Sequence, residues 1–253
     1  LRMAMGIVKV DPALAKTEAE KAVNNPIGVF KVNADVMKIK SPVDLNVIDV
    51  MSHSWVGLFM GADMQSILGG YEDPRIAKYW NTSEITPGQY ASVRNGVTYP
   101  SGTTYAKFSQ TGPRTKTGEV TWMSTAEVYF LRAEGALRGW NMGGTGKELY
   151  EAGIRASFEQ NGVEGAAAYA ADDTKKALDY VDPLFPANNT PAVSKVTVAW
   201  GANNEENLEK IITQKWIATY PDGQEAWSEF RRTGYPKLFR IVNNKSGGVI
   251  STE

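Results

Sequence analysis

The stretch AEVYFLRAEGALRGW, residues 126–140, decides the fold because it mixes bulky side chains with alanine and glycine at a helical spacing. Ala126, Phe130, Ala133, Leu137 and Trp140 follow one another at intervals of three or four residues, so they share one face of an α-helix. A neighbouring helix can approach closely at the alanines, while the larger residues fill the space between them. Because further apolar residues lie off this face, the pattern predicts an inner helix of a stacked helical array.

Glu134 and Arg138 stand four residues apart in the same stretch. We expect them to form a salt bridge on the remaining polar face of the helix, where such a pair contributes ~0.3 kcal/mol. This helix is therefore predicted to be part of the scaffold, and none of its residues needs to contact a ligand.

Helix signals elsewhere in the chain come in pairs. Asp11 and Pro12 form an N-cap followed by proline at the first helical position, and Gly162 is suited to end a helix in the left-handed conformation. The predicted pairs are residues 1–10 with 13–23, 126–140 with 147–160, and 205–220 with 224–234. A short helix over 173–181 and short strands over 193–200 and 28–36 complete a fold that is mainly α.

A loop-rich region, about residues 51–118, lies between the first two pairs. Its part from 69 to 118 holds seven Gly and four Pro, nearly twice their average share. Aromatic-rich loops on a rigid scaffold are where ligand contacts tend to lie. The candidate ligand-binding residues are Trp55, Tyr79, Trp80, Asn81, Tyr90, Arg94 and Tyr99. The alternative is that their side chains pack the loops against the helical scaffold.

The bulk properties exclude several classes of protein. The 253 residues carry a formal net charge of −1, which gives no electrostatic basis for binding nucleic acid or an anionic membrane. The chain has no cysteine and one histidine, His53, which excludes disulfides, Cys-ligated zinc and multi-His metal sites. The longest apolar run, residues 55–62, is too short to span a bilayer. We expect no metal or cofactor, and we expect His53 to be a hydrogen-bonded packing residue.

Asp222, Glu225 and Glu229 raise the alternative of a glycoside hydrolase, in which two carboxylates divide the acid and base duties. Glu225 and Glu229 are one helical turn apart, whereas hydrolases generally mount the pair on separate elements that face the substrate. We interpret these carboxylates, with Arg231 and Arg232, as a salt-bridged surface or a structural ion-pair network. No enzymatic activity is therefore expected.

Four stretches, distributed between residues 5 and 244, resemble the SusD-like (SusD/RagB) outer-membrane lipoproteins of Bacteroidetes. AEVYFLRAEGALRGWNMGGTGKELYEAGIRASFEQNGV (126–163) is similar to a helix pair of that family. LEKIITQKWIATYPDGQEAWSEFRRTGYPKLFRIVNN (208–244) is similar to its other strong signature. MGIVKVDPALAKTEAEKAV (5–23) and LGGYEDPRIAKYW (68–80) match the branch with the Arg-Arg-Thr-Gly ending, and all four occur in the expected order.

The resemblance implies tetratricopeptide-like helix pairs that carry long irregular loops, in a single domain over 1–253 that forms roughly the C-terminal half of a longer chain. It implies a cell-surface protein, held at the outer membrane by a lipid anchor that precedes this chain. The implied function is to bind a nutrient, usually a glycan, and deliver it to a SusC-like TonB-dependent transporter. Aromatic loops suit this function because a ring packs on the C–H face of a sugar while polar side chains bond its hydroxyls. A tetratricopeptide-like scaffold that binds peptides or proteins is the alternative.

Overall fold

The computed structural model describes residues 1–249, and its chain divides into two compact units. Unit 1 comprises Leu1–Ile39, Thr121–Asp173 and Val198–Pro236. Unit 2 comprises Lys40–Val120, Thr174–Thr197 and Lys237–Glu253. Each unit is therefore assembled from three separate stretches of the sequence.

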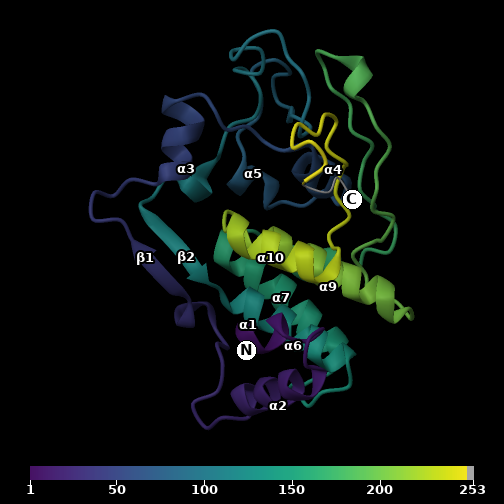
Figure 1. Cartoon of the computed structure of the whole chain (residues 1–253). Coiled ribbons are helices and arrows are strands. Elements are labelled where there is room, and N and C mark those ends of the chain that lie inside the picture. Colours follow the sequence, from purple (N-terminus) through teal and green to yellow (C-terminus); the bar gives the residue numbers. More distant parts are fainter. Residues whose placement is uncertain (250–253) are drawn as a thin grey trace. The chain divides into compact units, whose positions relative to one another are not determined.

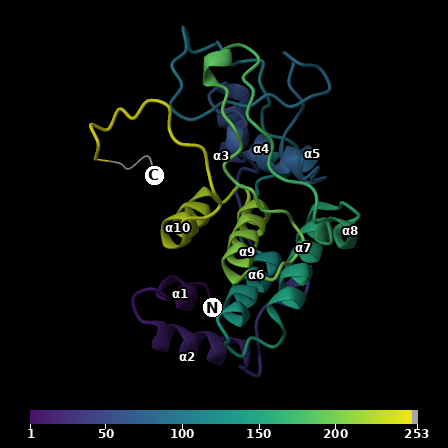
Figure 2. The same ribbon diagram turned by 90° about the vertical axis from the view of Figure 1, so that its right-hand side faces the viewer.

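Unit 1 holds the three helix pairs that the sequence predicts, which confirms the mainly α fold (Figure 1). Figure 2 shows α6, α7 and α9 packed beside one another. A shorter helix, α8, follows α7. The helices are α1 (Arg2–Gly6) with α2 (Pro12–Val23), α6 (Thr125–Leu137) with α7 (Gly146–Asn161), α9 (Asn204–Thr219) with α10 (Gly223–Thr233), and α8 (Ala166–Ala170).

Local capping interactions explain where these helices begin and end. The Asp11 carboxylate accepts a hydrogen bond from the backbone N–H of Leu14 (3.0 Å) at the start of α2. Thr145 and Glu148 form a reciprocal capping box at the start of α7, and Gly162 ends that helix with a left-handed φ of 59°. These signals act over a few residues, so the sequence alone reveals them.

In the core of unit 1 a large residue of α6 packs against a small residue of α7. The Phe130 ring is fully buried and faces Gly153 of α7, where an added Cβ would lie 2.6 Å from a ring carbon. The Tyr150 hydroxyl donates a hydrogen bond to the carbonyl of Val198 (2.7 Å), and its ring packs against Trp200. The large Phe130 side chain of α6 therefore fills the space left by Gly153 of α7.

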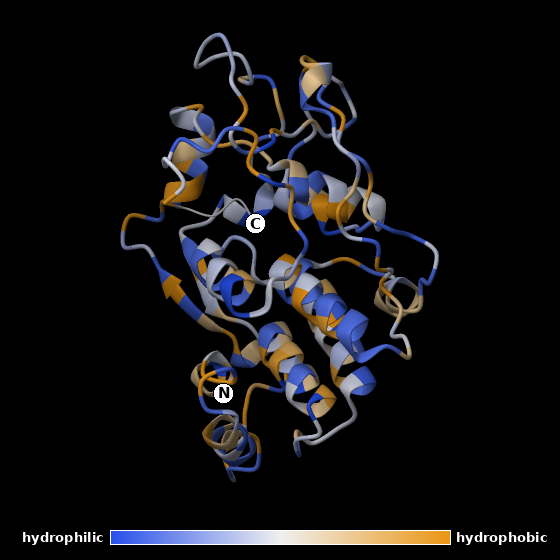
Figure 3. Ribbon diagram, turned by 45° about the vertical axis from the view of Figure 1, so that its right-hand side comes forward, coloured by the Kyte–Doolittle hydropathy of each residue, from blue (hydrophilic) through white to orange (hydrophobic). Residues whose placement is uncertain are grey.

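A buried network of ion pairs joins the helices of unit 1. Figure 3 shows hydrophilic residues interspersed with hydrophobic ones along these helices. The network holds four carboxylates and four cations, namely Glu127, Glu134, Glu225, Glu229, Arg2, Arg138, Lys215 and Arg232. The expected salt bridge of Glu134 and Arg138 forms (2.8 Å), and Arg138 is exposed. Glu134, however, is buried and also accepts two hydrogen bonds from Arg232 (2.6 Å each).

Unit 2 contains short helices connected by long loops. They are α3 (Val47–Asp49), the π-helix η2 (Val50–Ser54), α4 (Ala62–Gly70), α5 (Ile76–Tyr79) and the 3₁₀ helices η3 (Pro113–Thr115) and η4 (Pro186–Asn188). Strands β1 (Met37–Lys40) and β2 (Glu119–Met123), most of whose residues belong to unit 1, pair in a two-stranded sheet. Within residues 1–249, every helix is too short or too polar to traverse a lipid bilayer.

Three local predictions are wrong. Residues 173–181 form no helix, because their backbone bonds to distant segments: Leu178 N–H donates to Ser66 O (2.9 Å) and Tyr180 N–H to Thr190 O (2.9 Å). Residues 193–200 form no strand, since tyrosine hydroxyls, among them that of Tyr71, occupy carbonyls that a β ladder would use. Residues 28–36 contain the 3₁₀ helix η1 (Asn33–Asp35), and the strand β1 begins only after them.

Candidate ligand-binding site

Trp55 stands on a strained turn at the end of the π-helix η2. Its backbone N–H donates to the carbonyl of Val50 (3.1 Å), and the next residue, Val56, has a left-handed φ of 51°. A β-branched residue rarely adopts this conformation, which costs roughly 1–3 kcal/mol. The Trp55 side chain lies in solvent and is 70% exposed. Because π-helices and strained residues often mark functional sites, this turn is the best candidate for ligand contact.

Hydrogen bonds fix the π-helix to the segment around residue 110. The buried Ser52 hydroxyl donates to Leu58 O (2.8 Å) and accepts from the Thr111 N–H (3.1 Å). The Gln110 side-chain amide donates to the carbonyl of Ser52. The backbone on both sides of the turn that carries Trp55 is therefore anchored before a ligand binds, which lowers the entropic cost of binding.

A cluster of three charged or titratable side chains brings together Asp49 at the end of α3, His53 in η2 and Lys116 just after η3. Oδ1 of Asp49 forms an ion pair with Nζ of Lys116 (2.8 Å) and lies 3.0 Å from Nδ1 of His53. All three side chains are partly exposed, and each can exchange its contacts for those of a bound hydroxyl or amide. His53 was expected to be a packing residue, and instead it belongs to this polar cluster. Sequence reasoning missed Asp49 and Lys116. The i,i+4 spacing of Asp49 and His53 could have indicated Asp49, but no sequence signal indicated Lys116.

Asn81 is attached to the same segment as η2. Its backbone N–H donates to Gln110 O (2.9 Å), and its side-chain amide donates to Thr111 O (3.0 Å). Residues 110–111 thus hydrogen-bond both to Asn81 and to Ser52 of the helix that precedes Trp55. Asn81 itself is exposed.

Tyr79 and Trp80 do not fit the role predicted for them, because they are 0% and 5% exposed. Their backbone meets Gly112 so closely that a Cβ there would lie 2.8 Å from the Trp80 nitrogen. Gly112 N–H donates to Tyr79 O (2.7 Å), and Trp80 forms a β-bridge with Thr111. These two rings therefore belong to the core of unit 2, and the alternative interpretation, that they are packing residues, describes them better.

The remaining three candidates, Arg94, Tyr90 and Tyr99, differ in burial and in the number of contacts they make with the rest of unit 2. Arg94 donates to the carbonyls of Asn188 (3.4 Å) and Arg240 (3.1 Å), so it connects three segments of unit 2. Tyr90 is half-buried, and this burial raises the pKa of its hydroxyl.

Tyr99 is 49% exposed. Its ring makes an edge contact with the buried Tyr105 (5.7 Å between centroids), which holds it at the surface. Trp55 and Tyr99 are the two most exposed of the candidate rings, and they lie on separate segments of unit 2.

Comparison with known proteins identifies close structural relatives. A solved chitin-binding SusD homologue from Flavobacterium johnsoniae shares 59% sequence identity with a TM-score of 0.97, covering 99% of this chain and 52% of that one. A SusD homologue from Bacteroides thetaiotaomicron shares 40% identity with a TM-score of 0.91, covering 100% and 53%. One from Bacteroides vulgatus shares 38% with a TM-score of 0.92, covering 99% and 52%. The chain spans about half the length of these relatives. No curated protein matches it.

The family model described as "Susd and RagB outer membrane lipoprotein" matches residues 1–253. This match agrees with the four sequence stretches, the helix pairs of unit 1 and the solved relatives, and it confirms the resemblance. The chain therefore belongs to the SusD-like family of outer-membrane lipoproteins.

Proposed function

We propose that this protein binds an oligosaccharide at the cell surface and delivers it to a SusC-like TonB-dependent transporter. The observation that carries the proposal is Trp55, an indole ring held in solvent by a strained and anchored turn. An indole face suits the C–H face of a sugar ring, and the adjacent polar cluster of Asp49, His53 and Lys116 offers donors and acceptors for hydroxyl or acetamido groups.

Chitin oligosaccharides are the first ligands to test, because the relative with 59% identity is described as chitin-binding. A binding role without catalysis is also supported by Glu225 and Glu229. Both are buried, and they bond to Lys215 and Arg232 at 2.6 Å, so neither is presented to a substrate.

Isothermal titration with chitohexaose tests the role of Trp55. We expect Trp55→Ala to weaken binding at least about tenfold, since loss of a stacking ring costs on the order of 1–2 kcal/mol, while the melting temperature stays nearly unchanged. Trp227→Ala is the matched control, because Trp227 is half-exposed on α10 in unit 1 and should not affect the affinity. Unchanged affinity in Trp55→Ala would refute the assignment of Trp55.

Two further measurements test the rest of the proposal. Tight binding in a peptide-library screen with no hit on a glycan array would refute the carbohydrate ligand and favour the peptide-binding alternative. Delivery requires a complex, so the full-length lipoprotein should co-purify with a TonB-dependent transporter expressed alongside it. Failure to co-purify in detergent, with glycan binding intact, would contradict the delivery step alone.

A further inference from the structure

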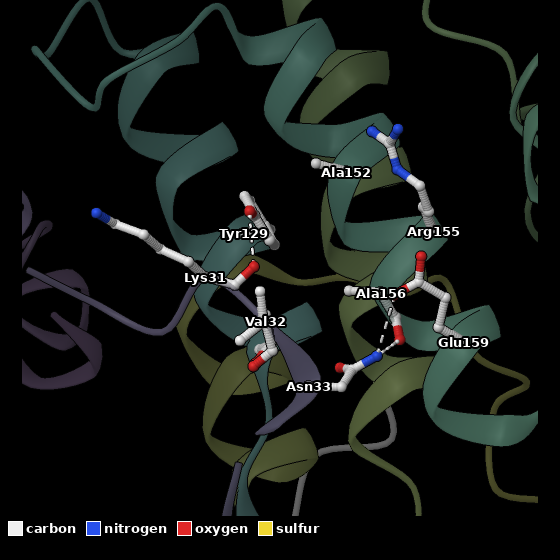
Figure 4. Close-up of a pocket in the computed structure, with 9 residues that line it drawn as sticks. Lys31, Val32, Asn33, Tyr129, Ala152, Arg155, Ala156 and Glu159 are labelled. Carbon is white, nitrogen blue, oxygen red and sulfur yellow. Dashed lines mark hydrogen bonds between the residues drawn. The ribbon is translucent and has the colours of Figure 1, made fainter. Parts of the chain in front are cut away.

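A polar pocket lies in unit 1, apart from the residues of the candidate site. It has a volume of about 250 Å³ and opens between α6, α7 and residues 31–33 (Figure 4). Ala152, Arg155, Ala156 and Glu159 line it from α7 at helical spacing, and Tyr129 lines it from α6. Because ligand pockets for drug-sized molecules measure roughly 300–1,000 Å³, this one has room for a single small ring.

The wall formed by residues 31–33 is fixed to both helices by side-chain hydrogen bonds. Thr125 donates from its hydroxyl to Val32 O (2.7 Å), and Tyr129 donates to Lys31 O (3.1 Å). The Asn33 amide donates to Ala156 O (3.0 Å). This wall is thus held in place by the protein itself, and two alanines and the Tyr129 ring also line the pocket.

Arg155 is the unusual member of this pocket. Within the described part of the chain, its guanidinium makes no hydrogen bond or ion pair. Both acidic neighbours at i±4 are engaged elsewhere, because Glu151 pairs with Lys147 (3.7 Å) and Glu159 accepts from the Asn33 amide (3.4 Å). In Figure 4 Arg155 and Glu159 rise from the same stripe of α7, whereas the Lys31 ammonium points away from them.

We propose that this pocket binds one uronic acid residue, a sugar ring that carries a carboxylate. The open guanidinium of Arg155 pairs with the carboxylate through two parallel N–H···O bonds. The carboxylate of Glu159 accepts hydrogen bonds from ring hydroxyls, and the Tyr129 ring packs against the C–H face. The pocket would thus bind an acidic sugar selectively, at a site that shares no residue with the proposed glycan site at Trp55.

Titration with D-galacturonic acid and with its methyl ester tests the proposal, because the ester keeps the ring but removes the charge. We expect the acid to bind at least about tenfold more tightly than the ester, with an affinity that falls as salt is added. Arg155→Gln should abolish this preference. Lys147→Gln is the matched control: it removes one positive charge from the same helix, and it should leave the preference unchanged.

Three outcomes would overturn the proposal. They are equal affinity of the unaltered protein for acid and ester, an unchanged preference in Arg155→Gln, and loss of galacturonate binding in Trp55→Ala. The last result would place the acid at the Trp55 site. Conversely, failure of chitohexaose to bind would refute the proposed function and leave the galacturonate measurements interpretable.

Discussion

Lys215 is fully buried among three carboxylates, so its removal makes a sharp test of how unit 1 is held together. Its ammonium lies 2.6 Å from Glu225, 3.4 Å from Glu229 and 3.7 Å from Glu127. Burial alone would lower the pKa of this lysine, yet the three carboxylates raise it above its ordinary value. Lys215→Met keeps an unbranched side chain that is one atom shorter, and it leaves the buried carboxylates with one cation fewer.

Removing one partner from a buried ion pair generally costs about 3–5 kcal/mol, because the other charge stays in a poorly solvated place. We expect that loss here, as the network would hold four carboxylates against three cations, all of them arginines. Lys147→Met, which removes an exposed partner 3.7 Å from Glu151, should cost less than about 0.5 kcal/mol.

Urea unfolding at pH 7 and pH 5 measures both the size and the cause of the effect. Burial acts to raise the pKa of Glu229, but Lys215 and Arg232 lower it overall, so its contribution is present at neutral pH and is lost as pH falls through that pKa. Without Lys215 we expect the pKa to rise for the glutamates that it contacts. As the pH falls, one of these carboxylates then takes up a proton, which removes the uncompensated negative charge. The difference in unfolding free energy should therefore be smaller at pH 5. A loss below about 1 kcal/mol, or one equal at both pH values, would refute this account.

Two other changes test the structure of unit 2. Trp80→Ala should destabilise the protein by about 3–5 kcal/mol, as expected for a buried large-to-small change; a melting temperature close to that of the unaltered protein would contradict the burial of this ring. Burial raises the pKa of Asp63 from 3.8 to about 6, although the hydrogen bond that Asp63 accepts from the Phe239 N–H acts to lower it. The protonated carboxyl therefore contributes stability that is full below about pH 4 and is lost as the pH rises through 6. Asp63→Asn should flatten that decline in urea midpoints measured from pH 4 to 7, and an unchanged slope would disprove the effect.

The sequence predicts the scaffold well because its signals are local. Asp11 before Pro12 and the alternation of Phe130 with alanine act within a few turns of helix. Residues 173–181 were predicted wrongly because the partners of their backbone, such as Ser66, lie far away in the sequence and outweigh weak helical propensity.

The candidate site was predictable only in part. Trp55 and Trp80 look alike in sequence as aromatic residues in loops, yet one is exposed and the other buried. Trp80 lies beside a segment that is distant in sequence, since its backbone meets Gly112, and no pattern near Trp80 reveals this neighbour. The pairing of Asp49 with Lys116 also depends on the folded path of the intervening loops.

The two-stranded sheet has a consequence for how such proteins diversify. Strands β1 and β2 pair at the two ends of Lys40–Val120, the longest segment of unit 2, so they act as a neck that closes this insert where it leaves and rejoins unit 1. With the neck closed, lengthening the insert adds little further entropic cost, because the closure penalty grows only logarithmically with loop length. An insert of different length or composition can then be exchanged at this neck without repacking the helix pairs. Residues that contact ligand in this insert can then change while the helix pairs of unit 1 stay the same.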